Sequence, residues 1–366
     1  MSGAGSVVLA GGGTAGHTSP LLATARELLE QRPDLRLTAV GTARGLETTV
    51  IPAAGLPLEL IPPVPMPRRP GVDLALVGPR LVSSVRATVA VLRRTGAQAV
   101  LGFGGYVSTP AYLAARRLGL PIVLHEQNLL PGLANRLAAR LTRHVFTSFP
   151  TTPLPHATCI GLPMRRSITE LDRAAARGPA RAAYGLPETG DAVLVSGGSQ
   201  GAASINRAVQ EARPALLAAG ISVLHVLGAK NITPDDVRAV DPDTGAVYVP
   251  IAYVEQMEQA YAVADLMLGR SGAGTVMETA AVGLPAVFVP YPHGNGEQAR
   301  NAALVVEAGG GLLLADADCT PEWVATEIPA LLGDSVRRRG MAEALAGVAR
   351  TDAAAVLAKR TLEVIG

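Results

Sequence analysis

The fold of this chain is indicated most clearly by residues 266–301, which read LMLGRSGAGTVMETAAVGLPAVFVPYPHGNGEQARN. The apolar run at residues 266–268 predicts a strand, the following RSGAG predicts a turn, and residues 275–282 predict a helix. Such a turn places backbone N–H groups and a helix N-terminus beside an anionic ligand. Glu278 lies one turn into the helix, where its carboxylate can accept hydrogen bonds from a pair of ribose hydroxyls. The alternative interpretation is an ordinary βαβ unit with polar loops.

The same order of strand, glycine turn and helix occurs twice more along the chain. Residues 7–10 lead into GGGTAGHTSP and a helical run at residues 21–31, and residues 192–196 lead into GGSQGA and a helical run at residues 204–219. Strands alternating with helices predict parallel, doubly wound sheets, so the chain is interpreted as two Rossmann-like α/β halves. Two matching glycine turns favour a ligand held in a cleft between the halves. The other predicted strands are residues 35–40, 58–61, 99–102, 122–125 and 144–147 in the first half, and 223–227, 247–250, 286–290 and 311–314 in the second.

The division between the halves is predicted near residue 160. Residues 149–163 contain four prolines, which disfavour a helix and suit a semi-rigid linker. A chain of 366 residues that is 48% hydrophobic can bury two cores of ordinary size. The predicted domains are therefore residues 1–160 and 161–366, with the possibility left open that the last helix packs back on the first domain.

The composition also restricts the compartment. Only two cysteines occur, Cys159 and Cys319, and their separation suggests neither a disulfide framework nor a zinc site. No basic region precedes the first apolar run, so that run is interpreted as a strand and not as a signal peptide. Residues 72–92 are hydrophobic but include Pro79, Arg80 and Arg86, which argues against a spanning helix. We therefore expect a soluble or peripheral protein in a reducing compartment.

The charge is distributed unevenly between the halves. Residues 1–150 hold 15 arginines against 7 acidic residues, whereas residues 151–366 hold 17 basic against 23 acidic residues. A basic half indicates an anionic partner, such as membrane headgroups, a phosphorylated substrate or nucleic acid. Nucleic acid is the weakest of these because aromatic residues make up only 3% and no recognition motif is evident. A dinucleotide oxidoreductase is disfavoured as well, because no acidic residue closes the second strand.

Seven motifs occur in the order found in the MurG family of peptidoglycan N-acetylglucosaminyltransferases, and the chain resembles that family over nearly its whole length. The motifs are GGGTAGH, GFGGYVSTPA, LHEQN, GLPMR, GGSQGA, RSGAGTVMETAAVGLP and GEQARNA. The resemblance implies a GT-B fold and transfer of N-acetylglucosamine from UDP-GlcNAc to lipid I, giving lipid II with inversion at the anomeric carbon. It also implies a peripheral enzyme on the cytoplasmic face of the cell membrane, without a cofactor, and leaves contacts with other cell-wall synthesis proteins open.

The resemblance assigns a role to residues that match the family's motifs. It makes His17 the candidate general base, Ser199 a diphosphate ligand, the Val254 backbone a uracil contact and Gln298 a sugar contact. Glu297 stands where many family members have a second amide, which leaves its contact with the sugar undecided. The remaining substrate-binding residues that the resemblance implies are Thr14, Ala15, Gly16, Asn128, Arg165, Ala273, Gly274, Thr275, Val276, Met277 and Glu278.

Chemistry supports His17 independently of the resemblance. The acceptor hydroxyl must lose its proton as it attacks, and an imidazole titrates near neutral pH. The alternative is a histidine that only orders the glycine loop. Charge on the departing UDP can be stabilised by helix N-termini, Ser199 and Arg165 without a metal. A rival interpretation takes Asp316 and Asp318 as a DxD-like metal site, although Asp318 and Thr320 serve equally well as caps of a helix beginning near Pro321.

Two other functions stay open at this point. A glycosyltransferase of secondary metabolism would share the second-half motifs but is expected to lack the GGYVS and HEQN loops. A nonenzymatic nucleotide-sugar-binding protein would not need His17.

Residues 66–94 are a candidate for contact with the membrane. They hold six arginines and one acid, and Leu74, Val77, Leu81 and Val85 form one apolar stripe on a helix. That stripe either packs on its own domain or meets anionic headgroups flanked by the arginines.

Overall fold

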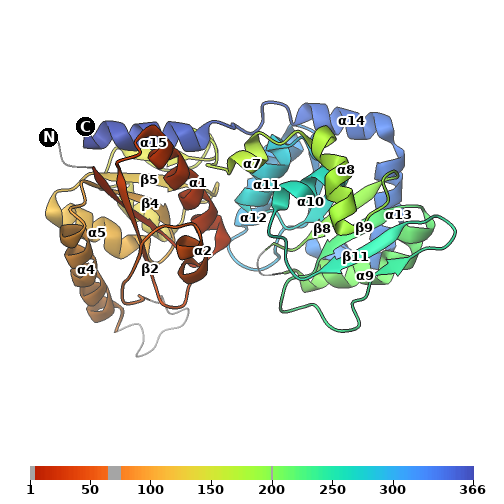
Figure 1. The fold of residues 1–366 in the computed structure, drawn as a ribbon, viewed down its shortest axis with the longest axis horizontal. Helices are drawn as coiled ribbons and strands as arrows, with labels where there is room; N and C mark the ends of the chain where they lie inside the picture. Colours follow the sequence, from red (N-terminus) through yellow and green to blue (C-terminus); the bar gives the residue numbers. More distant parts are fainter. Residues whose placement is uncertain (1–4, 65–75, 199–200) are drawn as a thin grey trace. The chain divides into compact units, whose positions relative to one another are not determined.

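The computed structural model describes residues 5–64, 76–198 and 201–366. The chain divides into two compact units, of which the first comprises residues 1–165 with 350–366 and the second residues 166–349 (Figure 1). Each unit is built on its own seven-stranded sheet. The first stretch of the first unit ends at Arg165, close to the division predicted near residue 160, and the C-terminal segment belongs to the first unit.

The first unit has a wholly parallel sheet in the order β3-β2-β1-β4-β5-β6-β7. Its strands are β1 (Ser6–Gly11), β2 (Arg36–Gly41), β3 (Leu58–Leu60), β4 (Ala99–Gly104), β5 (Ile122–Glu126), β6 (His144–Thr147) and β7 (Ala157–Cys159). Its helices are α1 (Ala15–Gln31), α2 (Glu47–Ala53), α4 (Val77–Arg94), α5 (Ser108–Leu118), α6 (Leu133–Ala138) and α15 (Ala353–Ile365).

The central strands of this sheet are buried on both faces, as expected for a parallel sheet covered by helices on each side. Val8 and Val100 belong to the apolar core on the face that carries α4 and α5. Val7 and Leu101 belong to the opposite core, together with Leu357 of α15. Helix α15 lies against α1, so the end of the chain completes the first unit (Figure 1).

The second unit has the sheet order β10-β11-β9-β8-β12-β13-β14, in which only the pair β10 and β11 is antiparallel among the described pairs. Its strands are β8 (Ala192–Ser196), β9 (Ser222–Val226), β10 (Ala239–Val240), β11 (Val247–Ile251), β12 (Leu266–Gly269), β13 (Ala286–Phe288) and β14 (Gly311–Leu313). Its helices are α7 (Arg166–Thr169), α8 (Arg173–Tyr184), α9 (Ala203–Ala218), α10 (Met257–Val263), α11 (Ala273–Ala281), α12 (Glu297–Glu307), α13 (Pro321–Gly333) and α14 (Ser335–Ala344), with a short 3₁₀ turn, η1 (Asp316–Asp318).

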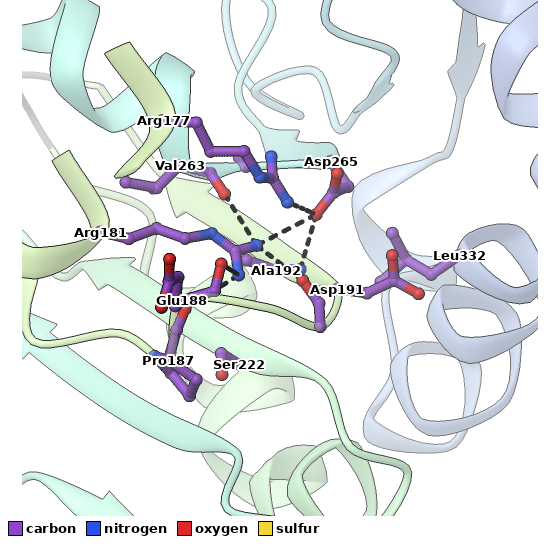
Figure 2. A network of polar contacts seen from close by, with 12 residues as sticks. Arg177, Arg181, Pro187, Glu188, Asp191, Ala192, Ser222, Val263, Asp265 and Leu332 are labelled. Atoms are coloured by element: carbon purple, nitrogen blue, oxygen red, sulfur yellow. Dashed lines mark hydrogen bonds and ion pairs between the residues drawn. The ribbon is translucent and has the colours of Figure 1, made fainter. Parts of the chain in front are cut away.

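A buried polar network fixes α8 to the start of β8 and to the segment before β12 (Figure 2). Asp265 accepts from the guanidinium of Arg177 at 2.7 Å and from the backbone N–H of Ala192 at 2.9 Å, and it lies 3.5 Å from Arg181. The Arg181 side chain is 1% exposed and also donates to three carbonyls of the loop before β8, those of Pro187, Glu188 and Gly190. A charge can be buried this deeply because each of these contacts replaces part of its hydration.

The predicted α/β fold with two parallel-sheet halves is confirmed. The predicted linker at residues 149–163 is partly wrong, because Ala157–Cys159 forms β7 and pairs with β6 at the edge of the first sheet. Helices α2, α7, α8, α10 and α12 were not predicted. Helix α1 begins at Ala15, six residues before the predicted start. Gly16 and Pro20 both disfavour helical interiors, but the helix includes them.

Candidate functional site

The first glycine turn lies at the carboxyl end of β1, where ligands of parallel sheets bind. Thr14 is the exposed residue that precedes α1, and Ala15 and Gly16 are the first two residues of that helix. His17 follows in the same turn, half-buried, with its Nδ1 3.2 Å from the Thr14 hydroxyl. The four predicted residues at positions 14–17 are therefore neighbours on one helical turn.

The GFGGY segment, which ends β4 and begins the loop after it, lies against this histidine. Gly104 and Gly105 both have positive φ angles, so side chains there would be strained. A Cβ at Gly105 would lie 2.6 Å from the Gly12 carbonyl oxygen, and one at Gly104 would lie 3.4 Å from the imidazole Cδ2 of His17. Burial of the imidazole removes water from it and lowers the pKa of His17. The imidazole is therefore neutral and able to accept a proton at neutral pH.

The HEQN motif forms a buried cluster at the end of β5. The Glu126 carboxylate accepts from the backbone N–H groups of Asn128 at 2.9 Å and Gly132 at 3.0 Å, and from the Asn135 amide at 3.0 Å. Burial raises the pKa of Glu126, and burial lowers the pKa of His125 to about 4. His125 is thus a neutral structural group whose Nε2 lies 2.9 Å from the Gly161 carbonyl oxygen.

Asn135 links this cluster to the first turn, although the sequence did not single it out. Its amide nitrogen donates to Glu126, and its amide oxygen accepts from the Tyr112 hydroxyl at 2.7 Å. The same amide nitrogen would lie 3.1 Å from a Cβ at Gly104, the residue that packs on His17. The predicted residues Asn128 and His17 therefore belong to one contiguous group of the first unit. Arg165, the last residue of that unit before α7, is exposed.

The anion site predicted for the second unit lies at the turn after β12. Gly272 precedes α11, and Ala273, Gly274 and Thr275 form its first turn. The first turn of a helix presents backbone N–H groups with no partner within the helix, so this end suits a phosphate. Residues Val276 and Met277 are buried and anchor the helix in the core. The geometry thus places residues 273–275 at a helix N-terminus, as the sequence predicted.

Glu278 lies half-buried in the second turn of α11. Its Oε2 accepts a hydrogen bond from the Tyr261 hydroxyl at 2.8 Å. Tyr261 is itself buried in α10, so this contact restricts the rotamers of the carboxylate. A carboxylate held in this way is suited to accept two hydroxyl hydrogen bonds from a ribose.

Arg270 connects the turn after β12 to η1. Its guanidinium donates to the Val289 and Pro290 carbonyls and pairs with the Asp316 carboxylate, which also accepts from the Ser204 hydroxyl at 2.7 Å. The rival metal interpretation loses support, because Asp316 is already neutralised by this arginine. No cluster of three or more His, Cys, Asp or Glu side chains suited to a metal occurs within residues 5–64, 76–198 and 201–366. Thr320 caps α13 by accepting from the Trp323 N–H, as predicted.

The second glycine turn follows β8, next to β12 in the sheet. The Arg270 N–H donates to the Ser196 carbonyl at 3.2 Å, so the two turns of this unit are adjacent. Ser199 lies outside the residues that the structure describes. Gly201 has a positive φ, and a Cβ there would lie 2.1 Å from the Asn231 amide nitrogen, so the tight turn requires glycine.

Two predicted ligands remain in the second unit. Gln298 lies in the first turn of α12, and its Oε1 accepts from the Tyr291 N–H at 2.9 Å, which ties the loop after β13 to that helix. Glu297 is the first residue of α12, and its N–H donates to the Asn295 side chain at 3.2 Å. Val254 is buried in the loop between β11 and α10. Contacts of these residues with a sugar or with uracil stay predictions.

Family models match both units of the chain. The N-terminal domain of glycosyltransferase family 28 matches residues 7–147, and the C-terminal domain of the same family matches residues 192–357. A Nocardioides sp. strain JS614 protein, named UDP-N-acetylglucosamine–N-acetylmuramyl-(pentapeptide) pyrophosphoryl-undecaprenol N-acetylglucosamine transferase, is 54% identical over 357 residues, which cover 98% of this chain and 97% of that protein. A protein of the same name from Cutibacterium acnes is 55% identical over 327 residues, covering 88% and 87%.

Solved structures share the architecture. MurG of Acinetobacter baumannii superposes with a TM-score of 0.72 at 24% identity, covering 98% of this chain and 99% of that one. The glycosyltransferase of kitacinnamycin also gives a TM-score of 0.72, at 15% identity, covering 99% and 100%. At these identities the likeness concerns the fold alone, and it confirms the predicted GT-B class.

Proposed function

The chain belongs to the MurG family within glycosyltransferase family 28, and we infer that it transfers N-acetylglucosamine from UDP-GlcNAc to lipid I, undecaprenyl-diphospho-MurNAc-pentapeptide, forming lipid II. The observation that carries this function is the 54% identity to a named transferase across 98% of the chain. The chain contains the GGYVS and HEQN loops, which a secondary-metabolite enzyme is expected to lack, and Asn135 donates to Glu126 of the second loop and lies beside Gly104 of the first.

We propose that the reaction inverts the anomeric carbon in a single displacement. The acceptor hydroxyl attacks that carbon, the bond from the carbon to the UDP oxygen breaks, and the proton of the hydroxyl passes to the imidazole of His17. The leaving diphosphate carries the charge that the α11 N-terminus, Ser199 and Arg165 stabilise in this proposal. The chemistry is proposed to need no metal, because Asp316 is committed to Arg270.

The proposed function is tested by UDP release from the purified protein. Release is expected to require both UDP-GlcNAc and a lipid I analogue, and to continue in EDTA. Release from UDP-GlcNAc alone would indicate hydrolysis, and release supported by unrelated acceptors would favour the secondary-metabolite alternative. Binding of UDP-GlcNAc without any turnover would favour a nonenzymatic nucleotide-sugar-binding protein.

Glu278→Ala is expected to weaken UDP binding by about 2–4 kcal/mol, because two charge-assisted hydrogen bonds to the ribose would be lost. Calorimetry measures the change, and 2′-deoxy-UDP provides the internal comparison, since the variant is expected to bind it as well as it binds UDP. Tyr261→Phe is the matched control, because it keeps the carboxylate and removes the 2.8 Å hydrogen bond that orients it. Unchanged UDP affinity in Glu278→Ala would remove this residue from the donor site.

We further propose peripheral association with an anionic membrane surface through α4. Among the described residues, no helix is long and apolar enough to cross a bilayer. Val85 of the predicted stripe packs on the core of the first unit, whereas Val82 is 50% exposed and Arg86 is exposed beside it. Leu74, Arg68 and Arg69 lie outside the described residues. The surface proposed for the membrane is therefore the exposed side of α4 and not the whole stripe.

Cosedimentation with anionic liposomes is expected to fall as salt rises and to fall again in Arg80→Glu/Arg86→Glu, because each arginine near such a surface contributes about 1 kcal/mol. The matched control is Arg207→Glu/Arg339→Glu, which makes the same charge change on exposed helical positions of the second unit. UDP binding is expected to stay unchanged in both variants. Liposome binding that ignores salt and the α4 substitutions would place the membrane contact elsewhere.

A further inference from the structure

Glu47, the first residue of α2, is a fully buried acid that lies beneath the first glycine turn. Its Oε2 accepts from the Gly13 N–H at 2.8 Å. Its Oε1 accepts from the backbone N–H of Thr42 at 3.0 Å and from the hydroxyl of the same residue at 3.1 Å. One carboxylate therefore joins the turn after β2 to the turn between β1 and α1.

Three glycines leave the space that this carboxylate fills. A Cβ at Gly12 would lie 2.8 Å from the Glu47 carboxyl group, one at Gly41 would lie 2.6 Å from its Cγ, and one at Gly45 would lie 1.8 Å from its Oε2. Burying an ionised carboxylate costs free energy that only well-formed hydrogen bonds offset. Glycines in both turns leave room for the carboxylate, which indicates that it has a specific role at this position.

The contacts lead from Glu47 to the imidazole of His17. The Gly13 N–H bound by Glu47 belongs to the turn immediately before α1, and the backbone of Gly12 hydrogen-bonds to His17. Gly105 packs on the other side of that backbone, since a Cβ on it would lie 2.6 Å from the Gly12 carbonyl oxygen. The segment that orients the imidazole is thus held between Glu47 and the loop after β4.

We propose that Glu47 is a positioning residue for the transfer reaction, which fixes the Gly12–Gly13 backbone and thereby the direction of the His17 imidazole. The inference rests on the proposed function, in which His17 accepts the proton of the acceptor hydroxyl. Glu47 does not contact the substrate in this role. It acts through His17 and leaves donor binding, which the proposed function assigns largely to the second unit, unaffected.

The charge of Glu47 also acts on His17. Desolvation lowers the pKa of His17, while the Gly12 hydrogen bond and the negative charge of Glu47 raise it. Among the described residues, the other groups that lie against the ring are Thr14, which precedes α1, and the glycines at 104 and 105, none of which titrates. Removing the Glu47 charge therefore lowers the pKa of His17. Activity that requires the neutral imidazole would then persist to lower pH, so the acidic limb of the profile moves down.

Glu47→Gln tests the inference because it keeps the size of the side chain and removes both the charge and one acceptor. We expect at least a tenfold loss of turnover, UDP-GlcNAc affinity within twofold of the parent, and an acidic limb of kcat/KM that moves to lower pH. Glu59→Gln, the same substitution at a half-buried carboxylate of this unit that pairs with Arg94, is the control and is expected to change none of these. A purely structural role would lower the amount of folded protein without moving the acidic limb.

Two further variants keep the test decisive. Thr42→Val removes one hydrogen bond to Oε1 and keeps the charge, so turnover is expected to fall less and the limb to stay in place, which remains measurable if Glu47→Gln folds poorly. Glu47→Gln/His17→Ala is expected to lose no more turnover than His17→Ala alone, because both changes act on one group. If Glu47→Gln lowers turnover by the same factor in the parent and in His17→Ala, the inference is overturned. Full turnover of His17→Ala would instead refute the proposed base and leave UDP release as the test of the function.

Discussion

Arg181→Ala is expected to lower the free energy of unfolding of the second unit by about 3–5 kcal/mol. The guanidinium is 1% exposed and donates to the Pro187 and Gly190 carbonyls at 3.0 and 2.7 Å (Figure 2). Truncation would remove the donor from these part-buried carbonyls, and would leave the Asp265 carboxylate with Arg177 as its remaining ion-pair partner. The expected loss is large because the variant removes one partner of a buried network and not the network as a whole.

Chemical denaturation followed by Trp323 fluorescence measures this loss. Trp323 is the single tryptophan of the chain and packs against the core of the second unit, so its signal reports that unit. Arg177→Ala is the matched control, because it removes a contact to the same Asp265 from a side chain that is 30% exposed, and it is expected to cost about 1 kcal/mol or less. A loss below about 1 kcal/mol in Arg181→Ala would show that the Arg181 contacts contribute little net stability.

The network also explains why α8 escaped prediction. Helix α8 has the sequence RAAARGPARAAY, in which Gly178 and Pro179 disfavour a helix. Its inward side is formed partly by Arg173 and Arg181, whose guanidinium groups donate to backbone carbonyls. Apolar periodicity cannot reveal a helix that buries charged side chains, and two partners of Arg173 lie 88 and 110 residues away in sequence. The strands were predicted more closely, since buried parallel strands are continuous apolar runs.

The candidate site was predicted in the same uneven way. The glycine turns and the N-terminus of α11 follow from local sequence, because a strand, a glycine turn and a helix are consecutive. Asn135 and Glu47 were not identified, since their partners Tyr112 and Gly13 lie 23 and 34 residues away. For Glu47 a local signal existed: Gly41 and Gly45 both precede it within six residues, and both leave room for its side chain. An acid that follows closely spaced glycines at the end of a strand is therefore a candidate for such a buried bridge.

His17→Ala is expected to lower turnover by about a hundredfold or more while UDP-GlcNAc affinity stays nearly unchanged. The lowered pKa of His17 leaves the imidazole neutral at pH 7, so removing it removes a base that is already in the required protonation state. In the parent enzyme kcat/KM is expected to fall as the pH drops through this pKa, below the usual value near 6.5, because protonated imidazole accepts no proton. The variant is expected to lack that acidic limb.

The loop-ordering alternative predicts a different set of results. The 3.2 Å contact between His17 Nδ1 and the Thr14 hydroxyl is the interaction through which the ring could order the glycine turn. Thr14→Val removes that contact and keeps the imidazole, so it separates the two roles. If His17 is the base, Thr14→Val keeps the acidic limb even where loss of the Thr14 hydroxyl weakens substrate binding, whereas His17→Ala loses both the limb and the turnover. If His17 only orders the loop, the two variants lose turnover and donor affinity to similar extents, since a disordered turn would impair binding and reaction together.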